Sequence, residues 1–343
     1  MFAYPPSARR ARFILLALLL LALFSLALAC CIGSVSLSVS ELFQSLTQLL
    51  HTSPDTLAAT LLELRLQRAL AAFVTGASLA LAGVLMQALL RNPLADPYVL
   101  GVSGGAAVGA FAAILLCGAL WMIDLAAFAG ALLVAGLLFG LAYKDFKGSG
   151  SSQGSAPTLL LTGVIVASGC MALISLILSI SPDSRLRSMM FWLMGDLSGV
   201  EARLSPWLIM VGVLLYASRQ ARAINVAALY ADSASTLGIP MGRLRKLLFF
   251  GAALLTASAV SSAGSIGFVG LIMPHACRFA WGPDHRLLLP ASCLAGGSFL
   301  VLADTLARTL VAPQQLPVGV ITALIGVPLF LLQLHHYRRH VGN

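Results

Sequence analysis

Arg91-Asn-Pro-Leu-Ala-Asp-Pro-Tyr-Val-Leu-Gly-Val-Ser-Gly-Gly105 is rich in proline and glycine and lies between two long apolar runs. A second stretch of this kind is Gly264-Ser-Ile-Gly-Phe-Val-Gly-Leu-Ile-Met-Pro-His-Ala-Cys-Arg278. Breaks at membrane depth leave backbone N–H and C=O groups that lipid cannot satisfy. Broken helices therefore persist only where they are buried in protein or line an aqueous path. The two stretches predict a membrane transporter.

The composition also indicates a membrane protein. Of the 343 residues, 59% are hydrophobic and 10% are charged, the mean hydropathy is +0.95, and soluble proteins average about 25% charged residues. The short polar breaks predict one transmembrane domain over residues 1–343, with no soluble domain. The net charge of +9 comes from basic residues scattered between apolar runs, which argues against a nucleic-acid-binding face.

The apolar runs predict an all-α protein with about ten transmembrane helices, because each span takes about 20 apolar residues. The spans are expected near residues 12–32, 66–90, 99–118, 121–142, 158–180, 203–218, 244–262, 266–281, 287–309 and 318–337. The first run could be taken for a cleaved secretory signal. Because no convincing cleavage site follows Cys30 and Cys31, it is interpreted as a retained span.

The distribution of Lys and Arg gives an orientation, since cytoplasmic loops carry an excess of both. With the N-terminus inside, most basic residues become cytoplasmic, and ten spans return Arg338 and Arg339 to the same side. Both termini are therefore predicted to be cytoplasmic. The basic residues left outside are Arg65, Arg68, Arg185, Arg187, Arg203 and Arg308.

Both broken stretches resemble the signature regions of the permease subunits of ABC importers for iron complexes and vitamin B12, the FecCD/BtuC-like type II importers. The resemblance extends to Leu79-Ala-Leu-Ala-Gly-Val-Leu-Met-Gln87, to Asp284-His-Arg286, and to Leu316-Pro-Val-Gly-Val-Ile-Thr-Ala-Leu-Ile-Gly-Val-Pro-Leu-Phe330. From Arg65 onward nearly the whole chain follows the family's pattern. Gln67 and Ser265 stand where the family usually has proline.

The resemblance implies a type II ABC importer permease in a bacterial inner membrane, working as a homodimer with the path on its two-fold axis. It also implies two copies of a separate ATPase subunit and a periplasmic substrate-binding protein. The sequence lacks the Gly-x-x-x-x-Gly-Lys-Ser/Thr phosphate loop, so the energy is expected to enter through another subunit. No catalytic group, cofactor or metal site is predicted in the chain itself.

The cargo is expected to be an iron complex, a ferric siderophore or haem, because such complexes make up most of this family's cargo. Cobalamin is the alternative within the family. An ion-coupled secondary transporter is the rival class, which calls for paired intramembrane carboxylates or matching broken helices in inverted repeats. Only Asp304 is a candidate for such an intramembrane carboxylate, and Arg308 lies beside it. A membrane scaffold without transport activity would leave the broken helices unexplained.

The polar segment 219–246 is the predicted contact with the ATPase. Residues 225–237 have an amphipathic pattern that predicts a short helix, and Gly238 and Pro240 supply a stop and a turn. By resemblance, Ala231, Leu237 and Gly238 lie at the coupling contact, and glycine permits close backbone approach. The alternative is an ordinary interfacial helix lying on the membrane.

Arg65, Arg68 and Arg308 are expected to be exposed at the outer mouth, where cations attract an acidic partner. By resemblance, they dock the substrate-binding protein; the alternative is contact with lipid headgroups or snorkelling at helix ends. Asp304 lies four residues before Arg308, a spacing that favours a local ion pair over an independent functional carboxylate.

The turn at Asn92, Pro93, Asp96 and Pro97 is predicted to be rigid and close to a cytoplasmic gate. Both prolines break the helix, and both polar side chains can accept hydrogen bonds from freed backbone amides. Asp96 is interpreted as a cap rather than a proton relay.

The second broken stretch is expected to open the eighth span at Gly267 and to be interrupted by Pro274. His275 and Cys277 could suggest a metal site, but an i,i+2 pair points to different helix faces. A buried His275 bonded to a carbonyl freed by Pro274 is the preferred interpretation.

The translocation path is predicted along the uncharged fifth span. Its small and hydroxylated residues suit close packing or the wall of a non-adhesive pore, and the family lines its path with this helix. Gly163, Ser168 and Met171 are the predicted path residues.

Overall fold

A computed structural model describes residues 7–33, 35, 38–51, 56–116, 118–143, 155–229, 234 and 237–341. Within these residues every regular element is a helix and no strand occurs. The elements are α1 (Ala8–Cys31), α2 (Val39–His51), α3 (Leu57–Leu90), η1 (Pro97–Leu100), α4 (Val102–Leu116), α5 (Leu120–Leu141), α7 (Ser155–Ile180), α8 (Asp183–Met194), α9 (Leu204–Arg219), α10 (Ala221–Leu229), α11 (Met241–Ala263), α12 (Val269–Trp281), α13 (His285–Thr309) and α14 (Val318–Val341).

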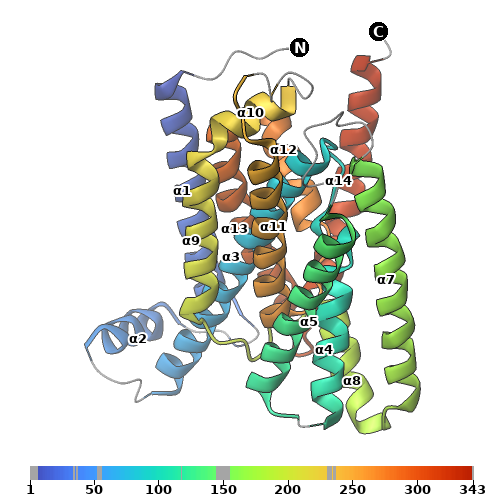
Figure 1. Ribbon diagram of the computed structural model, residues 1–343. Coiled ribbons are helices and arrows are strands. Elements are labelled where there is room, and N and C mark those ends of the chain that lie inside the picture. The colour runs from blue at the N-terminus through green and yellow to red at the C-terminus, as the bar shows by residue number, and fades with distance from the viewer. Residues whose placement is uncertain are drawn as a thin grey trace.

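Each of the ten predicted spans corresponds to a helix, which confirms the all-α polytopic architecture. Helices α1, α3, α5, α7, α11 and α13 are long and apolar enough to cross a membrane. Shorter apolar helices follow at Val102–Leu116, Leu204–Arg219 and Val318–Leu332. The sequence did not reveal α2 and α8, which lie at one end of the bundle in Figure 1, while α10 lies at the other end.

Helix α3 forms the centre of the bundle, and α7 lies at its edge (Figure 1). In the most apolar window of each helix, 94% of the α3 residues are buried, against 17% in α7. Glycines allow α3 to approach its neighbours, because a Cβ on Gly76 would lie 2.3 Å from the carbonyl oxygen of Gly296 in α13. Small residues at such crossings are how membrane helices pack closely without a hydrophobic driving force.

The eighth span differs from its predicted bounds of 266–281. Helix α12 begins at Val269 and has 13 residues, which give a length of about 20 Å, less than the ~30 Å hydrocarbon core. The preceding backbone cannot continue a helix, because Gly264 has φ 69° and Phe268 has φ 71°. Pro274 lies inside α12 without ending it, so the prediction that it interrupts the span was wrong. The break lies upstream, at residues 264–268.

The ends of the bundle agree with an even number of crossings. The first residues of α1 and the last residues of α14 both lie at the end of the bundle that carries α10 (Figure 1). That this end faces the cytoplasm remains a prediction from the positions of Lys and Arg.

Candidate functional site

The two broken stretches, far apart in the sequence, meet inside the bundle. The backbone N–H of Ile266 donates to the hydroxyl of Tyr98 over 3.1 Å. The ring of Pro97 faces Gly270, where an added Cβ would lie 3.0 Å from its Cδ. Residues 97–98 and 266–270 therefore form one unit of irregular backbone packed inside the bundle, as a lipid environment requires, whereas residues 92–94 of the first stretch are exposed.

Pro274 affects the packing of this unit because proline has no backbone N–H to donate. Without an N–H, it leaves the carbonyl of Gly270, four residues earlier, without its helical donor. That carbonyl faces Gly83 of α3, where an added Cβ would lie 1.8 Å from the oxygen. Glycine at position 83 is thus required for α3 and α12 to lie together.

The first turn is built as its residues predict. The side chain of Asn92 accepts from the N–H of Leu94 over 2.9 Å. Asp96 caps η1 by accepting from the N–H of Tyr98 over 2.7 Å. These bonds confirm that both side chains bind freed backbone amides, while the gate itself stays a prediction.

The second broken segment is anchored to α8. Ser265 N–H donates to the carbonyl of Trp192 over 3.2 Å, and Asp196 N–H donates to the carbonyl of Ala263 over 3.0 Å. Gly264 sits so close to Trp192 that an added Cβ would lie 2.2 Å from its carbonyl oxygen. At Gly267 an added Cβ would meet nothing within 4 Å, so this predicted gate residue has space around it.

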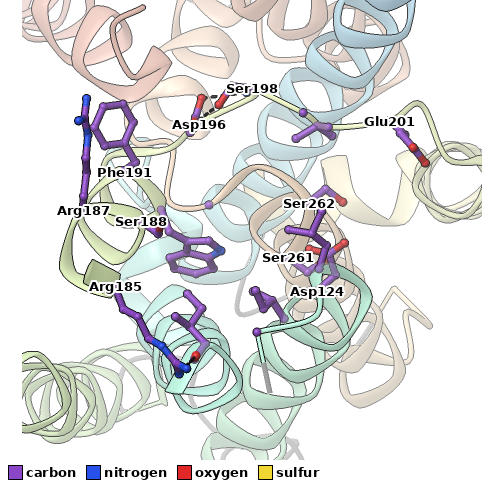
Figure 2. A pocket seen from close by; sticks show the side chains of 18 of the residues that line it. Asp124, Arg185, Arg187, Ser188, Phe191, Asp196, Ser198, Glu201, Ser261 and Ser262 are labelled. Atoms are coloured by element: carbon purple, nitrogen blue, oxygen red, sulfur yellow. Dashed lines mark hydrogen bonds between the residues drawn. The ribbon is translucent and has the colours of Figure 1, made fainter. Parts of the chain in front are cut away.

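A pocket of about 660 Å³ opens beside this anchor. Figure 2 shows Arg185 and Arg187 of α8 on one side, and Asp124 of α5 with Ser261 and Ser262 of α11 on the other. Sequence reasoning missed this pocket because its wall combines three separate parts of the chain, residues 114–124, 184–203 and 261–264. The available signal was the set of basic residues left on the outer side.

The six arginines that were predicted to lie outside each have a partner in the structure. Arg185 donates to the carbonyls of Ile114 and Leu115, which end α4. Arg203 pairs with Asp124, and Arg187 lies 5.7 Å from the ring centroid of Phe191. The remaining three, Arg65, Arg68 and Arg308, lie near the adjoining ends of α3 and α13.

Asp304 is the centre of a buried ionic cluster, defined as Arg68, Asp304 and Arg308. Arg68 Nη2 lies 2.8 Å from Asp304 Oδ1, and Arg68 Nε lies 3.0 Å from Oδ2. Arg308 Nε lies 3.1 Å from Oδ2, at ion-pair distance without the alignment of a hydrogen bond. The predicted i,i+4 pair is confirmed, and Arg68 joins it from α3. Two cations and one anion leave the cluster positive.

The expectation that these arginines are exposed was wrong. Arg65 is 7% exposed and Arg308 is 5% exposed. Arg65 donates to the carbonyls of Cys30, at 3.0 Å, Cys31 and Val35, and thereby satisfies backbone oxygens at the end of α1. The physical reason is that helix ends and a carboxylate provide acceptors inside the bundle, which the sequence pattern did not reveal.

Replacing Asp304 with asparagine is expected to lower the free energy of unfolding by about 3–5 kcal/mol, because the change leaves Arg308 buried without a counter-charge. The matched control is Asp124→Asn, in a pair whose side chains are 45% and 28% exposed, where a loss of about 1 kcal/mol or less is expected. Thermal unfolding of both variants in detergent measures the difference. Equal losses would contradict the structural role assigned to the cluster.

The predicted coupling segment is partly described. Helix α10 begins at Ala221, four residues before the predicted start, and ends at Leu229; Ala231 lies outside the described residues. Leu237 is 62% exposed. Gly238 has φ 79°, and an added Cβ there would meet nothing within 4 Å. Both residues are therefore open to a partner, and the backbone at position 238 favours glycine.

The predicted path residues do not share one face of α7. Gly163 is buried against η1, where an added Cβ would lie 3.1 Å from the carbonyl oxygen of Val99. Met171 is 59% exposed, and Ser168 is exposed with its hydroxyl bonded to the carbonyl of Val164. The grouping of Gly163 with the other two was wrong, because this glycine serves helix packing.

His275 contacts the ring of Phe330, at 6.3 Å between centroids. Its Nδ1 is buried and has no hydrogen-bond partner among the described residues, so the expected bond to a freed carbonyl is not made by that atom. Nowhere among the residues that the structure describes could a group of three or more His, Cys, Asp or Glu side chains hold a metal ion.

Comparisons with known proteins agree with this architecture. The family model described as the FecCD transport family matches residues 18–336. The cobalamin import system permease protein BtuC of Halobacterium salinarum is 45% identical over 82% of this chain and 74% of its own length. The vitamin B12 import system permease protein BtuC of Escherichia coli is 40% identical over 95% of both chains.

Solved structures give the same result. A structure described as an inward-facing conformation of an ABC transporter assigned to the metal-chelate type has a TM-score of 0.82, at 32% identity over 95% of this chain and 99% of its own. PsaBC from Streptococcus pneumoniae, in complex with Fab, has a TM-score of 0.54 at 17% identity, covers 85% and 94% of the two chains, and supports the fold alone. The chain has a type II ABC importer permease fold and belongs to the FecCD transport family.

Proposed function

We propose that this chain is the membrane-spanning permease subunit of an ATP-driven importer and that its cargo is cobalamin. The observation that carries the cargo assignment is the 40% identity, over 95% of both chains, to a permease named for vitamin B12 import. A second relative named for cobalamin import is 45% identical. These relatives favour the alternative within the family over the iron complex that the sequence alone suggested.

An iron complex is the second candidate. It is favoured by the similarity to the structure assigned to the metal-chelate type, at 32% identity. Both cargoes are large chelates, and the same fold would carry either. The described residues contain no cluster suited to binding a metal directly, so recognition of a whole chelate would fall to a soluble binding protein.

The partners follow from the same assignment. Two copies of an ATPase subunit would bind at the end of the bundle that carries α10, where Leu237 and Gly238 are exposed. A periplasmic binding protein would dock at the opposite end, near Arg65 and the positive cluster of Arg68, Asp304 and Arg308. A second copy of the chain would complete the path in the bacterial inner membrane, with both termini in the cytoplasm and Ser168 and Met171 facing the path.

ATP would drive the permease by shifting its population between outward and inward access. The ATPase pair would hydrolyse ATP, and the permease would convert its motion into opening at either end. The buried unit formed by the two broken stretches is suited to this task. Discontinuous helices of this kind form the substrate sites of other transporters, where one bundle moves against another around the site.

Uptake by liposomes tests the cargo. The chain is reconstituted with its ATPase and binding protein, with ATP inside, and radiolabelled cobalamin, a ferric siderophore and haem are supplied in parallel. We expect accumulation of cobalamin and little of the iron complexes. Accumulation of an iron complex alone would overturn the cargo assignment and leave the transport mechanism in place.

A further inference from the structure

Asn225 joins the predicted coupling segment to the first turn of α13. Its Nδ2 donates to Asp284 Oδ1 over 2.7 Å. Its Oδ1 accepts from the backbone N–H of His285 over 2.9 Å and lies 2.7 Å from His285 Nδ1. One side chain of α10 thus binds three groups at the start of another helix.

The chemistry of the partners fixes how this amide is oriented. A carboxylate only accepts hydrogen bonds, so the NH₂ group of Asn225 faces Asp284 and its oxygen faces His285. His285 Nδ1 must then carry the hydrogen, and the ring donates to Asn225. Asp284 also accepts from the N–H of Arg286 over 3.0 Å, as the N-cap of α13.

Burial makes these bonds expensive to lose. His285 is 4% exposed and Asn225 is half-buried, so water has little access to replace the amide. Without Asn225, the N–H and Nδ1–H of His285 would be left without acceptors, and each buried unsatisfied donor costs about 1–3 kcal/mol. The contact therefore holds α10 and α13 together at a defined position.

Helix α13 connects this contact to the opposite end of the bundle. At about 1.5 Å per residue, the helix places His285 and Asp304 roughly 28 Å apart along its axis. Asp304 holds Arg68 of α3 and Arg308 in the ionic cluster. A displacement of α13 at its first turn thus reaches the groups near the proposed docking face.

We propose that Asn225 is the positioning residue through which movement of α10 by the ATPase is passed to α13 and on to the Asp304 cluster. This inference rests on the proposed function and names the contact through which its energy travels. The exposed residues Leu237 and Gly238 receive the ATPase, and Asn225 transmits the motion. Loss of the contact leaves ATP hydrolysis in place and uncouples it from transport.

Four variants remove, disturb, preserve or restore the hydrogen bonds between Asn225 and the start of α13. Asn225→Ala removes the amide. Asn225→Asp keeps its size but sets a carboxylate against that of Asp284. Asp284→Asn keeps an oxygen that accepts from Asn225 and Arg286, and is the matched control. The exchange variant, which combines Asn225→Asp with Asp284→Asn, restores the pattern, because the amide now at position 284 donates to the carboxylate now at position 225.

The measurement is the number of cobalamin molecules taken up per ATP hydrolysed, in liposomes holding the chain, its ATPase and its binding protein. We expect Asn225→Ala and Asn225→Asp to lower this ratio about tenfold, with ATP hydrolysis and ATPase binding changed by less than about twofold. The control and the exchange variant are expected to stay within about threefold of wild type. If Asn225→Ala fails to fold, Asn225→Asp and the exchange variant decide whether Asn225 couples ATP hydrolysis to transport.

A wild-type ratio in Asn225→Asp, or an exchange variant as poor as Asn225→Asp, would overturn the inference. The wild type in the same experiment distinguishes failure of this inference from failure of the proposed function. If wild type transports cobalamin and the variants match it, Asn225 has no coupling role and the proposed function stands. If wild type accumulates none of the cargoes with ATP, the proposed function fails and this inference fails with it.

Discussion

Replacing Gly83 with leucine is expected to leave little folded protein. The carbonyl oxygen of Gly270 lies where a Cβ at position 83 would be, at 1.8 Å from its ideal position. The obstacle is backbone, so it cannot move aside as a flexible side chain could. Overpacking costs about 1–3 kcal/mol and occasionally more, and here we expect about 3 kcal/mol or more. Fluorescence-detected size-exclusion chromatography in detergent measures the yield of monodisperse protein.

Gly136→Leu is the matched control for this prediction. Gly136 also lies within a long apolar helix, α5, but it is exposed, and an added Cβ would meet nothing within 4 Å. The same substitution is expected to leave the yield close to wild type. Equal yields of the Gly83 and Gly136 variants would contradict the close crossing of α3 and α12.

Replacing Gly238 with arginine is expected to abolish transport while leaving the permease folded. The glycine has φ 79° and open space around it, so the cost within the chain is about 1–2 kcal/mol of left-handed backbone strain. A large cation at the contact with the ATPase would cost about 3 kcal/mol or more, as hot-spot substitutions do. Co-purification of the ATPase and ATP-driven uptake measure the effect.

Gly238→Asn separates backbone strain from obstruction of the contact. Asparagine adopts the left-handed conformation more readily than other residues with a side chain, and it is much smaller than arginine. We expect this variant to retain most ATPase binding. If the arginine variant binds the ATPase as wild type does, residue 238 lies outside the coupling contact.

Much of the architecture follows from local pattern. The apolar runs predicted a helix at each of the ten spans, and six of these helices are long and apolar enough to cross a membrane. The capping roles of Asn92 and Asp96 were also predictable, since each bonds an amide two residues away. The short helices α2 and α8 escaped because neither contains an apolar run of spanning length.

Tertiary contacts set the limits of sequence reasoning. Arg68 and Asp304 are separated by 236 positions, and nothing local to either residue indicates that they pair. The burial of Arg65 depends on carbonyls at the end of α1, and the inward position of Gly163 depends on η1. The role of each such residue depends on a partner far away in the sequence, and only the folded structure identifies that partner.

The energy dependence of cobalamin uptake decides whether this permease works in an ATP-driven importer. Liposomes holding the chain, its ATPase and its binding protein are compared with ATP inside, with a proton or sodium gradient alone, and with neither. We expect accumulation of cobalamin with internal ATP and none with a gradient alone. Accumulation driven by the gradient without ATP would contradict an ATP-driven importer and favour a secondary transporter.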